Sequence, residues 1–365
     1  MDFSRGNENL TEISARQWEY ITQDNLSARE AVEFLRSGMQ MRSFRDVLRL
    51  VYGNDQVEQQ LTQALCQMNE SVQPDSIRRK ISNWMNGRAL PTEREEVFRI
   101  CFALGLSLEQ SESMLNLLTD QGIHYRNLQE VIYAYCLRFG LSYHDAFHLM
   151  QQLRGERASN SGYPQTRLIA QDFLSIHGEE DLLSFVARHR DQMGAYHNTA
   201  YGYFCKMLAL LTGETLEGEK TYSMEYVADE YLRLNVPKEK KTARYSDVQK
   251  LVKKNWPSPR SIKAMKSRAE DVDRKTLLLL YLVTEGSWDE AYDELDEAYI
   301  QPREVLVEHC RRMNKMLMEC GMRRIDPRSA FDYLLLYCLL PEEGMDMSQR
   351  MSALAAELFG ETDRV

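Results

Sequence analysis

The sequence lacks any apolar run long enough to cross a bilayer. A membrane-spanning helix needs about 18 or more consecutive apolar residues, and the strongest run here is TLLLLYLV, residues 276–283. The N-terminus, MDFSRGNENLTEIS, also lacks the basic region followed by an apolar core that marks a signal or transit peptide. These absences predict a cytoplasmic protein without a membrane partner.

Motifs for enzymatic chemistry are also absent. The chain has no GxxxxGK phosphate loop, no GxSxG elbow and no clear cysteine–histidine arrangement. His144 and His148 lie four residues apart, as a metal-binding pair on one helical face would. No third ligand and no HExxH glutamate accompanies them, which favours a packing or hydrogen-bonding role. The sequence therefore predicts no catalytic residue, no metal ligand and no cofactor.

The cysteines do not form a disulfide framework or a zinc motif. They are odd in number and none lies in a CxxC, whereas most stand within apolar helical faces: Cys66, Cys101, Cys136, Cys205, Cys310, Cys320 and Cys338. This pattern is typical of small buried side chains in a reducing compartment.

Acidic residues outnumber basic residues overall, but positive charge is concentrated in one segment. The net charge of −10 argues against a protein that coats nucleic acid indiscriminately, because phosphate attraction needs a positive surface. Residues 238–268, however, contain eleven basic residues and only two acids, Glu239 and Asp247. A focused basic patch on an acidic protein favours oriented docking on nucleic acid. The alternative is a solvated surface or a contact for an acidic protein.

The periodic segments follow the helical repeat of 3.6 residues, and strand-like alternation is nearly absent. We therefore expect an all-α protein. Amphipathic helices are predicted at 44–52, 57–68 and 76–85, and two more follow, so that five short helices occupy residues 43–118.

The stretch ISNWMNGRALPTEREEVFRICFALGLS, residues 81–107, contains the signals that end and begin helices. Thr92 and Glu95 have the spacing of a capping box, as do Ser107 and Gln110. Gly105 is placed to end the intervening helix in a left-handed conformation. Trp84 shares a face with Ile81 and Met85 and is expected in the core rather than stacked on bases.

An internal repeat is predicted at a shift of 180 residues. Residues 85–115, MNGRALPTEREEVFRICFALGLSLEQSESML, align without a gap to residues 265–295. This alignment pairs Met85 with Met265, Arg88 with Arg268, Arg94 with Arg274, Ser107 with Ser287, Gln110 with Glu290 and Leu115 with Leu295. Residues 126–137 then resemble residues 328–339 at a larger shift, which we attribute to an inserted helix at 302–320. Chance similarity between amphipathic helix pairs is the alternative.

Residues 43–118 resemble a helix-turn-helix domain of the Cro and phage-repressor type. The features that carry the resemblance occur in the order Ser82, Gly87, Arg88, Pro91, FALGLS (102–107) and LEQSESML (108–115). The family's usual glutamate before the glycine is Met85 here, and Asn69 would supply the left-handed turn in place of a glycine.

The resemblance implies that helix 76–88 enters the major groove of double-stranded DNA. Arg78 and Arg79 would bond to guanine edges, Asn83 would read adenine and Lys80 and Arg88 would contact phosphates, with Asn86 on the same surface. The alternative is that these side chains are simply solvated. In the second unit, the phosphate-contacting residues would be Lys253, Lys254, Arg260, Lys263, Lys266 and Arg268.

These observations predict two related helix-turn-helix-like units joined by a helical middle region. The expected parts are an N-terminal arm at 1–42, a DNA-binding domain at 43–118, a middle domain at 119–221, a second unit at 222–340 and a tail at 341–365. The predicted function is a non-catalytic, sequence-specific transcriptional regulator of bacterial or mobile-element type. A homodimer and a peptide or protein effector are compatible with this layout, and a protein-interaction adaptor whose units no longer bind DNA is the alternative.

Overall fold

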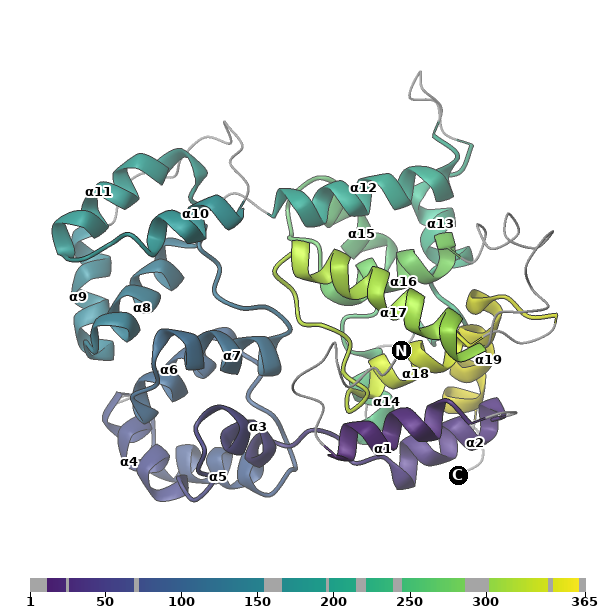
Figure 1. Ribbon diagram of the computed structural model, residues 1–365, viewed down its shortest axis with the longest axis horizontal. Coiled ribbons are helices and arrows are strands. Elements are labelled where there is room, and N and C mark those ends of the chain that lie inside the picture. Colours follow the sequence, from purple (N-terminus) through teal and green to yellow (C-terminus); the bar gives the residue numbers. More distant parts are fainter. Residues whose placement is uncertain are drawn as a thin grey trace. The chain divides into compact units, whose positions relative to one another are not determined.

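The computed structural model describes residues 12–23, 26–68, 72–153, 166–194, 197–214, 221–238, 245–285, 302–340 and 344–360. These residues contain nineteen α-helices and no β-strand, which confirms the all-α prediction (Figure 1). None of the helices in these ranges is long and apolar enough to span a membrane.

The chain divides into two compact units. Unit 1 comprises the described parts of residues 1–41, 199–320 and 324–365, and unit 2 comprises those of residues 42–198 and 321–323. The helices of unit 2 are α3 (Phe44–Val51), α4 (Glu58–Met68), α5 (Pro74–Met85), α6 (Arg94–Leu104), α7 (Leu108–Thr119), α8 (Leu128–Phe139), α9 (Tyr143–Leu153), α10 (Thr166–Phe173) and α11 (Glu179–His189).

Unit 1 begins with α1 (Glu12–Ile21), α2 (Ala28–Glu33) and the π-helical turn η2 (Phe34–Gly38). Its later helices are α12 (Asn198–Thr212), α13 (Met224–Glu230), α14 (Asp247–Lys253), α15 (Pro259–Lys266), α16 (Arg274–Glu285), α17 (Pro302–Glu319), α18 (Ala330–Cys338) and α19 (Met347–Phe359). The helix α2 packs against α19, and α18 also packs against α19. The predicted domain boundaries stay a prediction.

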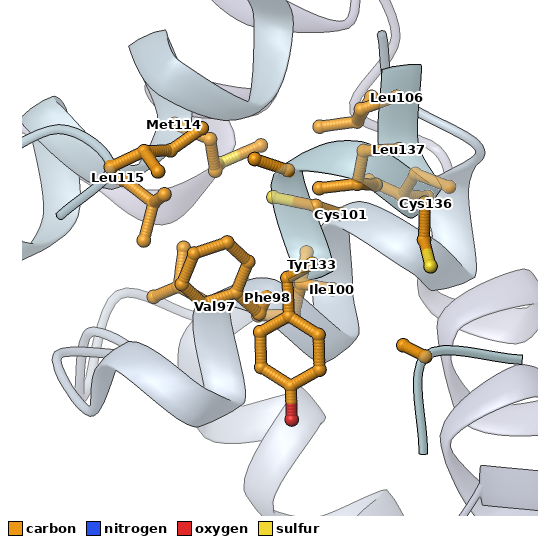
Figure 2. Packing of buried hydrophobic residues seen from close by; sticks show 14 of the residues in the cluster. Val97, Phe98, Ile100, Cys101, Leu106, Met114, Leu115, Tyr133, Cys136 and Leu137 are labelled. Atoms are coloured by element: carbon orange, nitrogen blue, oxygen red, sulfur yellow. The ribbon is translucent and has the colours of Figure 1, made fainter. Parts of the chain in front are cut away.

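The five helices expected at 43–118 are present as α3 to α7, and their apolar faces meet in one core. On α6, Val97, Ile100, Cys101 and Leu104 recur at helical spacing and are buried. Side chains from α6, α7 and α8 converge on this core (Figure 2). Burial also raises the pKa of the Cys101 thiol to about 12, so this cysteine packs as a small apolar group.

Two of the three predicted helix-end signals occur as expected. Ser107 and Gln110 form the reciprocal capping box of α7, and Gly105 ends α6 in the left-handed conformation with φ 62°. The Thr92–Glu95 box is wrong, because the N-cap of α6 is Glu93, which makes no side-chain capping bond.

The Glu95 carboxylate is instead used by two tyrosines from other helices. It accepts hydrogen bonds from the hydroxyls of Tyr133 on α8, at 2.9 Å, and Tyr143 on α9, at 2.6 Å. Burial raises the pKa of Tyr133, which keeps this hydroxyl protonated and able to donate. A partly buried hydroxyl needs a hydrogen-bond acceptor, so Glu95 bonds to these tyrosines instead of forming the predicted cap.

All seven cysteines are free thiols. Five of them are buried, whereas Cys66 and Cys205 are half-buried. The prediction of thiols packed within helical faces is therefore confirmed for the five buried residues.

In unit 2, an arginine–carboxylate pair joins α6 to α8. The Arg94 guanidinium donates to both carboxylate oxygens of Glu130, at 2.8 and 2.6 Å, and to the carbonyl of Gly122, at 2.6 Å. Glu130 also accepts from the backbone N–H of His124, six residues before it, at 2.8 Å. The pair thereby fixes the segment between α7 and α8.

Unit 1 contains the same network at the positions that the repeat predicts. Arg274 on α16 donates to both oxygens of Asp332 on α18, at 2.8 and 2.7 Å, and to the carbonyl of Arg324, at 3.2 Å. Asp332 accepts from the backbone N–H of Asp326, again six residues before it, at 2.9 Å. These matched contacts support the predicted repeat.

The networks also show which helices correspond. The backbone N–H of Ile123 donates to Glu112 on α7, and that of Ile325 donates to Asn314 on α17, at 3.0 and 2.8 Å. Helix α17 therefore takes the place of α7, so the prediction that residues 302–320 form an inserted helix is wrong. The predicted pairings at Ser287, Glu290 and Leu295 lie outside the described residues.

The turns that follow α5 and α15 are equivalent with a shift of 181 residues. Gly87 has φ 71°, and the next two backbone N–H groups donate to the carbonyl of Asn83, at 2.9 and 3.3 Å. Arg268 has φ 56°, and the next two N–H groups donate to the carbonyl of Ala264, at 2.8 and 3.3 Å. Arg268 thus corresponds to Gly87. The predicted gapless alignment, which paired Arg268 with Arg88 and Met265 with Met85, is therefore wrong by one residue in this turn.

Candidate nucleic-acid interface

Helix α5 is two-sided because its apolar residues recur at helical spacing. Pro74 lies in its first turn, where no intrahelical N–H donor is needed. Ile77, Ile81, Trp84 and Met85 are buried, and the helix packs against α3 and α4. Trp84 is only 3% exposed, which confirms that it belongs to the core.

The exposed residues of α5 and its following turn include most of those predicted to contact DNA. Arg78, Arg79, Lys80, Asn86 and Arg88 are exposed on α5 and the turn that follows it. Asn83 is half-buried, and its backbone carbonyl accepts the two hydrogen bonds that close this turn. The amide of Asn86 donates to the Ser82 hydroxyl, at 3.1 Å.

Two of these cations have acidic neighbours. Arg78 pairs with Asp75 on the same helix, at 2.9 Å, and Lys80 pairs with Glu96 on α6. Exposed ion pairs of this kind contribute about 0–1 kcal/mol. They can therefore be exchanged for other anionic partners at little cost. Arg79 and Arg88 form no ion pair with any residue that the structure describes.

The end of α5 is held by a contact that the sequence did not predict. The Arg45 guanidinium on α3 donates from Nε to the carbonyl of Met85, at 2.7 Å. A cation at a helix C-terminus satisfies an otherwise unpaired carbonyl and interacts favourably with the helix dipole. The bond spans forty residues of sequence, so no local pattern indicates it.

The cations predicted to contact phosphates in the second helix-turn-helix-like repeat lie around α15 and define what we call the α15 surface: Lys253, Lys254, Arg260, Lys263, Lys266 and Arg268. Ser258 caps this helix through the backbone N–H of Ser261. Lys254, Arg260 and Lys263 are exposed, and the other three are half-buried.

Aromatic rings hold two cations of the α15 surface in place. The Lys253 ammonium lies 4.6 Å from the ring centre of Tyr245, and the Arg268 guanidinium lies 4.0 Å from that of Tyr201. The Tyr201 hydroxyl also donates to the carbonyl of Lys266, at 2.9 Å. Such cation–π contacts restrict the side chain but leave its charge in place.

Only part of the basic run at 238–268 is available to this surface. Lys238 pairs with Asp229, at 2.8 Å, and Lys250 pairs with Asp247, at 3.0 Å. Lys240, Lys241 and Arg244 lie outside the described residues, as does Asn69, which was predicted to supply a turn in the 43–118 domain.

The described parts of the chain contain no group of three or more His, Cys, Asp or Glu side chains that could hold a metal ion. What the geometry does provide is an exposed helix face with cations and amides, and a second surface that gathers six cations. No known protein family, curated protein or solved structure matches this chain. The resemblance to Cro and phage repressors therefore stays a hypothesis that depends on the motif residues.

Proposed function

We propose that this chain is a non-catalytic regulator that binds double-stranded DNA sequence-specifically. In this proposal, α5 lies in the major groove and the α15 surface contacts phosphates. The observation that carries it is the two-sidedness of α5: the apolar face is buried, while Arg78, Arg79 and Lys80 are exposed.

The chemistry of the two surfaces suits different parts of a duplex. The major groove admits an α-helix, and there arginine can bond bidentately to guanine while asparagine can bond to adenine. The exposed arginines and the amides of α5 are of these types. The α15 surface is defined by six cations, which suit phosphates, because phosphate contacts set orientation without reading sequence.

The alternative is a protein-interaction adaptor with the same helices. The observation that favours it is that Arg78 and Lys80 already have acidic partners on the protein. In that case the cations would stabilise α5, and the α15 surface would bind an acidic protein.

Selection of bound fragments from random duplex DNA, followed by a salt titration with the selected duplex, tests the proposal. We expect an enriched sequence and an affinity that falls steeply with salt, since contacted phosphates release counterions. An adaptor would enrich no sequence at any salt concentration.

Arg78→Ala combined with Arg79→Ala tests the reading role of α5. The double variant should lose about 1–3 kcal/mol of discrimination between the selected duplex and a mismatched one for each lost bidentate contact. Arg88→Ala should instead weaken binding to both duplexes equally. Arg29→Ala, which changes an exposed arginine on α2, should leave both affinities unchanged. Unchanged discrimination in the double variant would remove these arginines from base reading.

A further inference from the structure

The two histidines of α9 are exposed and contact each other. His144 and His148 lie one helical turn apart, and their Nε2 atoms are 2.9 Å apart. The rings meet edge to face, with an interplanar angle of 86°. Neither imidazole has a hydrogen bond to any other described side chain. The predicted packing or hydrogen-bonding role is therefore confirmed as a hydrogen bond within the pair itself.

The separation of the two Nε2 atoms fits a metal ion with ligands at right angles. Two imidazole nitrogens, each about 2.0–2.1 Å from one ion, lie about 2.9 Å apart when they occupy adjacent square-planar or octahedral positions. Tetrahedral positions at the same bond length would place them about 3.4 Å apart. The observed distance of 2.9 Å matches the first arrangement.

The fold does not require histidines at these positions. The capping box of Ser142 and Asp145 on α9 corresponds to that of Asp346 and Gln349 on α19. Counted from these caps, His144 and His148 correspond to Ser348 and Ser352. The buried side chains Ala146 and Leu149 anchor α9 to its core independently of the pair.

A negative charge lies beside the pair. The Asp145 carboxylate accepts from the backbone N–H and the hydroxyl of Ser142, at 2.8 and 2.6 Å. Its charge favours a cation at the neighbouring imidazoles.

We propose that His144 and His148 form a bis-histidine site for a divalent transition metal ion of tetragonal preference, Cu²⁺ or Ni²⁺. Ions of this class favour imidazole nitrogen in square-planar or tetragonal geometry. The protein supplies two adjacent ligands, and water completes the coordination. The site does not depend on the proposed DNA-binding function, because it uses none of the residues assigned to DNA.

Calorimetric titration of the untagged, full-length protein with Ni²⁺ tests the site. We expect one ion per chain, and His144→Ser combined with His148→Ser should weaken binding about tenfold or more, because both imidazole ligands are lost. The serines reproduce the residues of α19, so the variant should keep its helical circular dichroism spectrum. His177→Ser, which removes an exposed histidine outside the pair, should bind as the parent does.

Electron paramagnetic resonance of the Cu²⁺ complex gives a second readout. The parent should show coupling to two imidazole nitrogens, and the His144→Ser single variant should show coupling to one. Equal Ni²⁺ affinity in the parent and the double serine variant would overturn the proposal. A parent protein that binds no Ni²⁺ at millimolar concentration would overturn it as well.

Discussion

Glu112 and Asn314 accept the same backbone hydrogen bond in the two units, but only Glu112 can ionise. Each side chain receives the N–H of the isoleucine eleven residues later, Ile123 or Ile325. Burial raises the pKa of Glu112, whereas the hydrogen bond from Ile123 and the nearby Arg94 lower it by a smaller amount. An ionised carboxylate at this position is therefore costly, and unit 1 shows that an amide can replace it.

Glu112→Gln should stabilise the protein at neutral pH, because the amide keeps an acceptor for Ile123 and removes the buried charge. A raised pKa in the folded state means that the parent loses stability as the pH rises from the ordinary pKa of glutamate through the pKa of Glu112 in the folded protein. The advantage of the variant should therefore be present at about pH 8 and absent below about pH 4, the ordinary range of glutamate.

Urea unfolding midpoints of the parent and Glu112→Gln at the two pH values measure this difference. A variant that is less stable than the parent at the higher pH would show that Arg94 stabilises the charged form by more than burial destabilises it.

At the scale of the element, the turn after α5 determines how the helix presents its end. Gly87 has φ 71°, and a Cβ there would meet no other atom within 4 Å. Any cost of a side chain at this position therefore comes from the backbone conformation alone. Arg268, in the equivalent turn, adopts this conformation with its guanidinium over the Tyr201 ring.

Gly87→Ala should lower the free energy of unfolding by about 1–2 kcal/mol, the cost of the left-handed conformation for an L-residue. Gly202→Ala is the matched control, because Gly202 lies within α12, has no contact within 4 Å of the added Cβ and does not have a positive φ. There alanine should stabilise the helix by about 0.5–1 kcal/mol. Chemical denaturation of both variants should therefore give changes of opposite sign, and equal changes would contradict this account of the turn.

At the scale of the molecule, charge is distributed so that an acidic chain can still attract a polyanion locally. The net charge is −10, yet Arg260, Lys263 and Lys266 form no ion pair with any described residue. Repulsion from the rest of the chain would restrict binding to this surface and to α5. The salt dependence of binding reports how many phosphates are contacted.

Lys263→Glu combined with Lys266→Glu should weaken duplex binding at low salt and reduce the slope of log affinity against log salt by about 2, since two phosphate contacts are lost. Lys315→Glu combined with Arg303→Glu makes the same change in net charge on the exposed side of α17 and should have a much smaller effect. Fluorescence anisotropy with the selected duplex measures both. If the two double variants have equal slopes, the α15 surface takes no part in binding and only the role of α5 remains.

The sequence by itself determined the local features of this protein. The all-α class, the positions of α3 to α7, the Ser107 cap, the left-handed Gly105 and the burial of Trp84 all follow from helical periodicity and hydrogen bonds within a few residues. Exposure of Arg78, Arg79 and Lys80 followed from the same periodicity, because these residues fall outside the apolar positions of α5.

Only the tertiary structure decided which distant groups meet. The pairing of Arg94 with Glu130, the use of Glu95 by two tyrosines and the stacking of Arg268 on Tyr201 join residues that are 36 or more positions apart. Buried polar groups take whichever partner the packing brings within reach, and a local pattern carries no information about that partner. For the same reason, the correspondence of α17 with α7 became visible from hydrogen bonds between helices rather than from the order of residues along the chain.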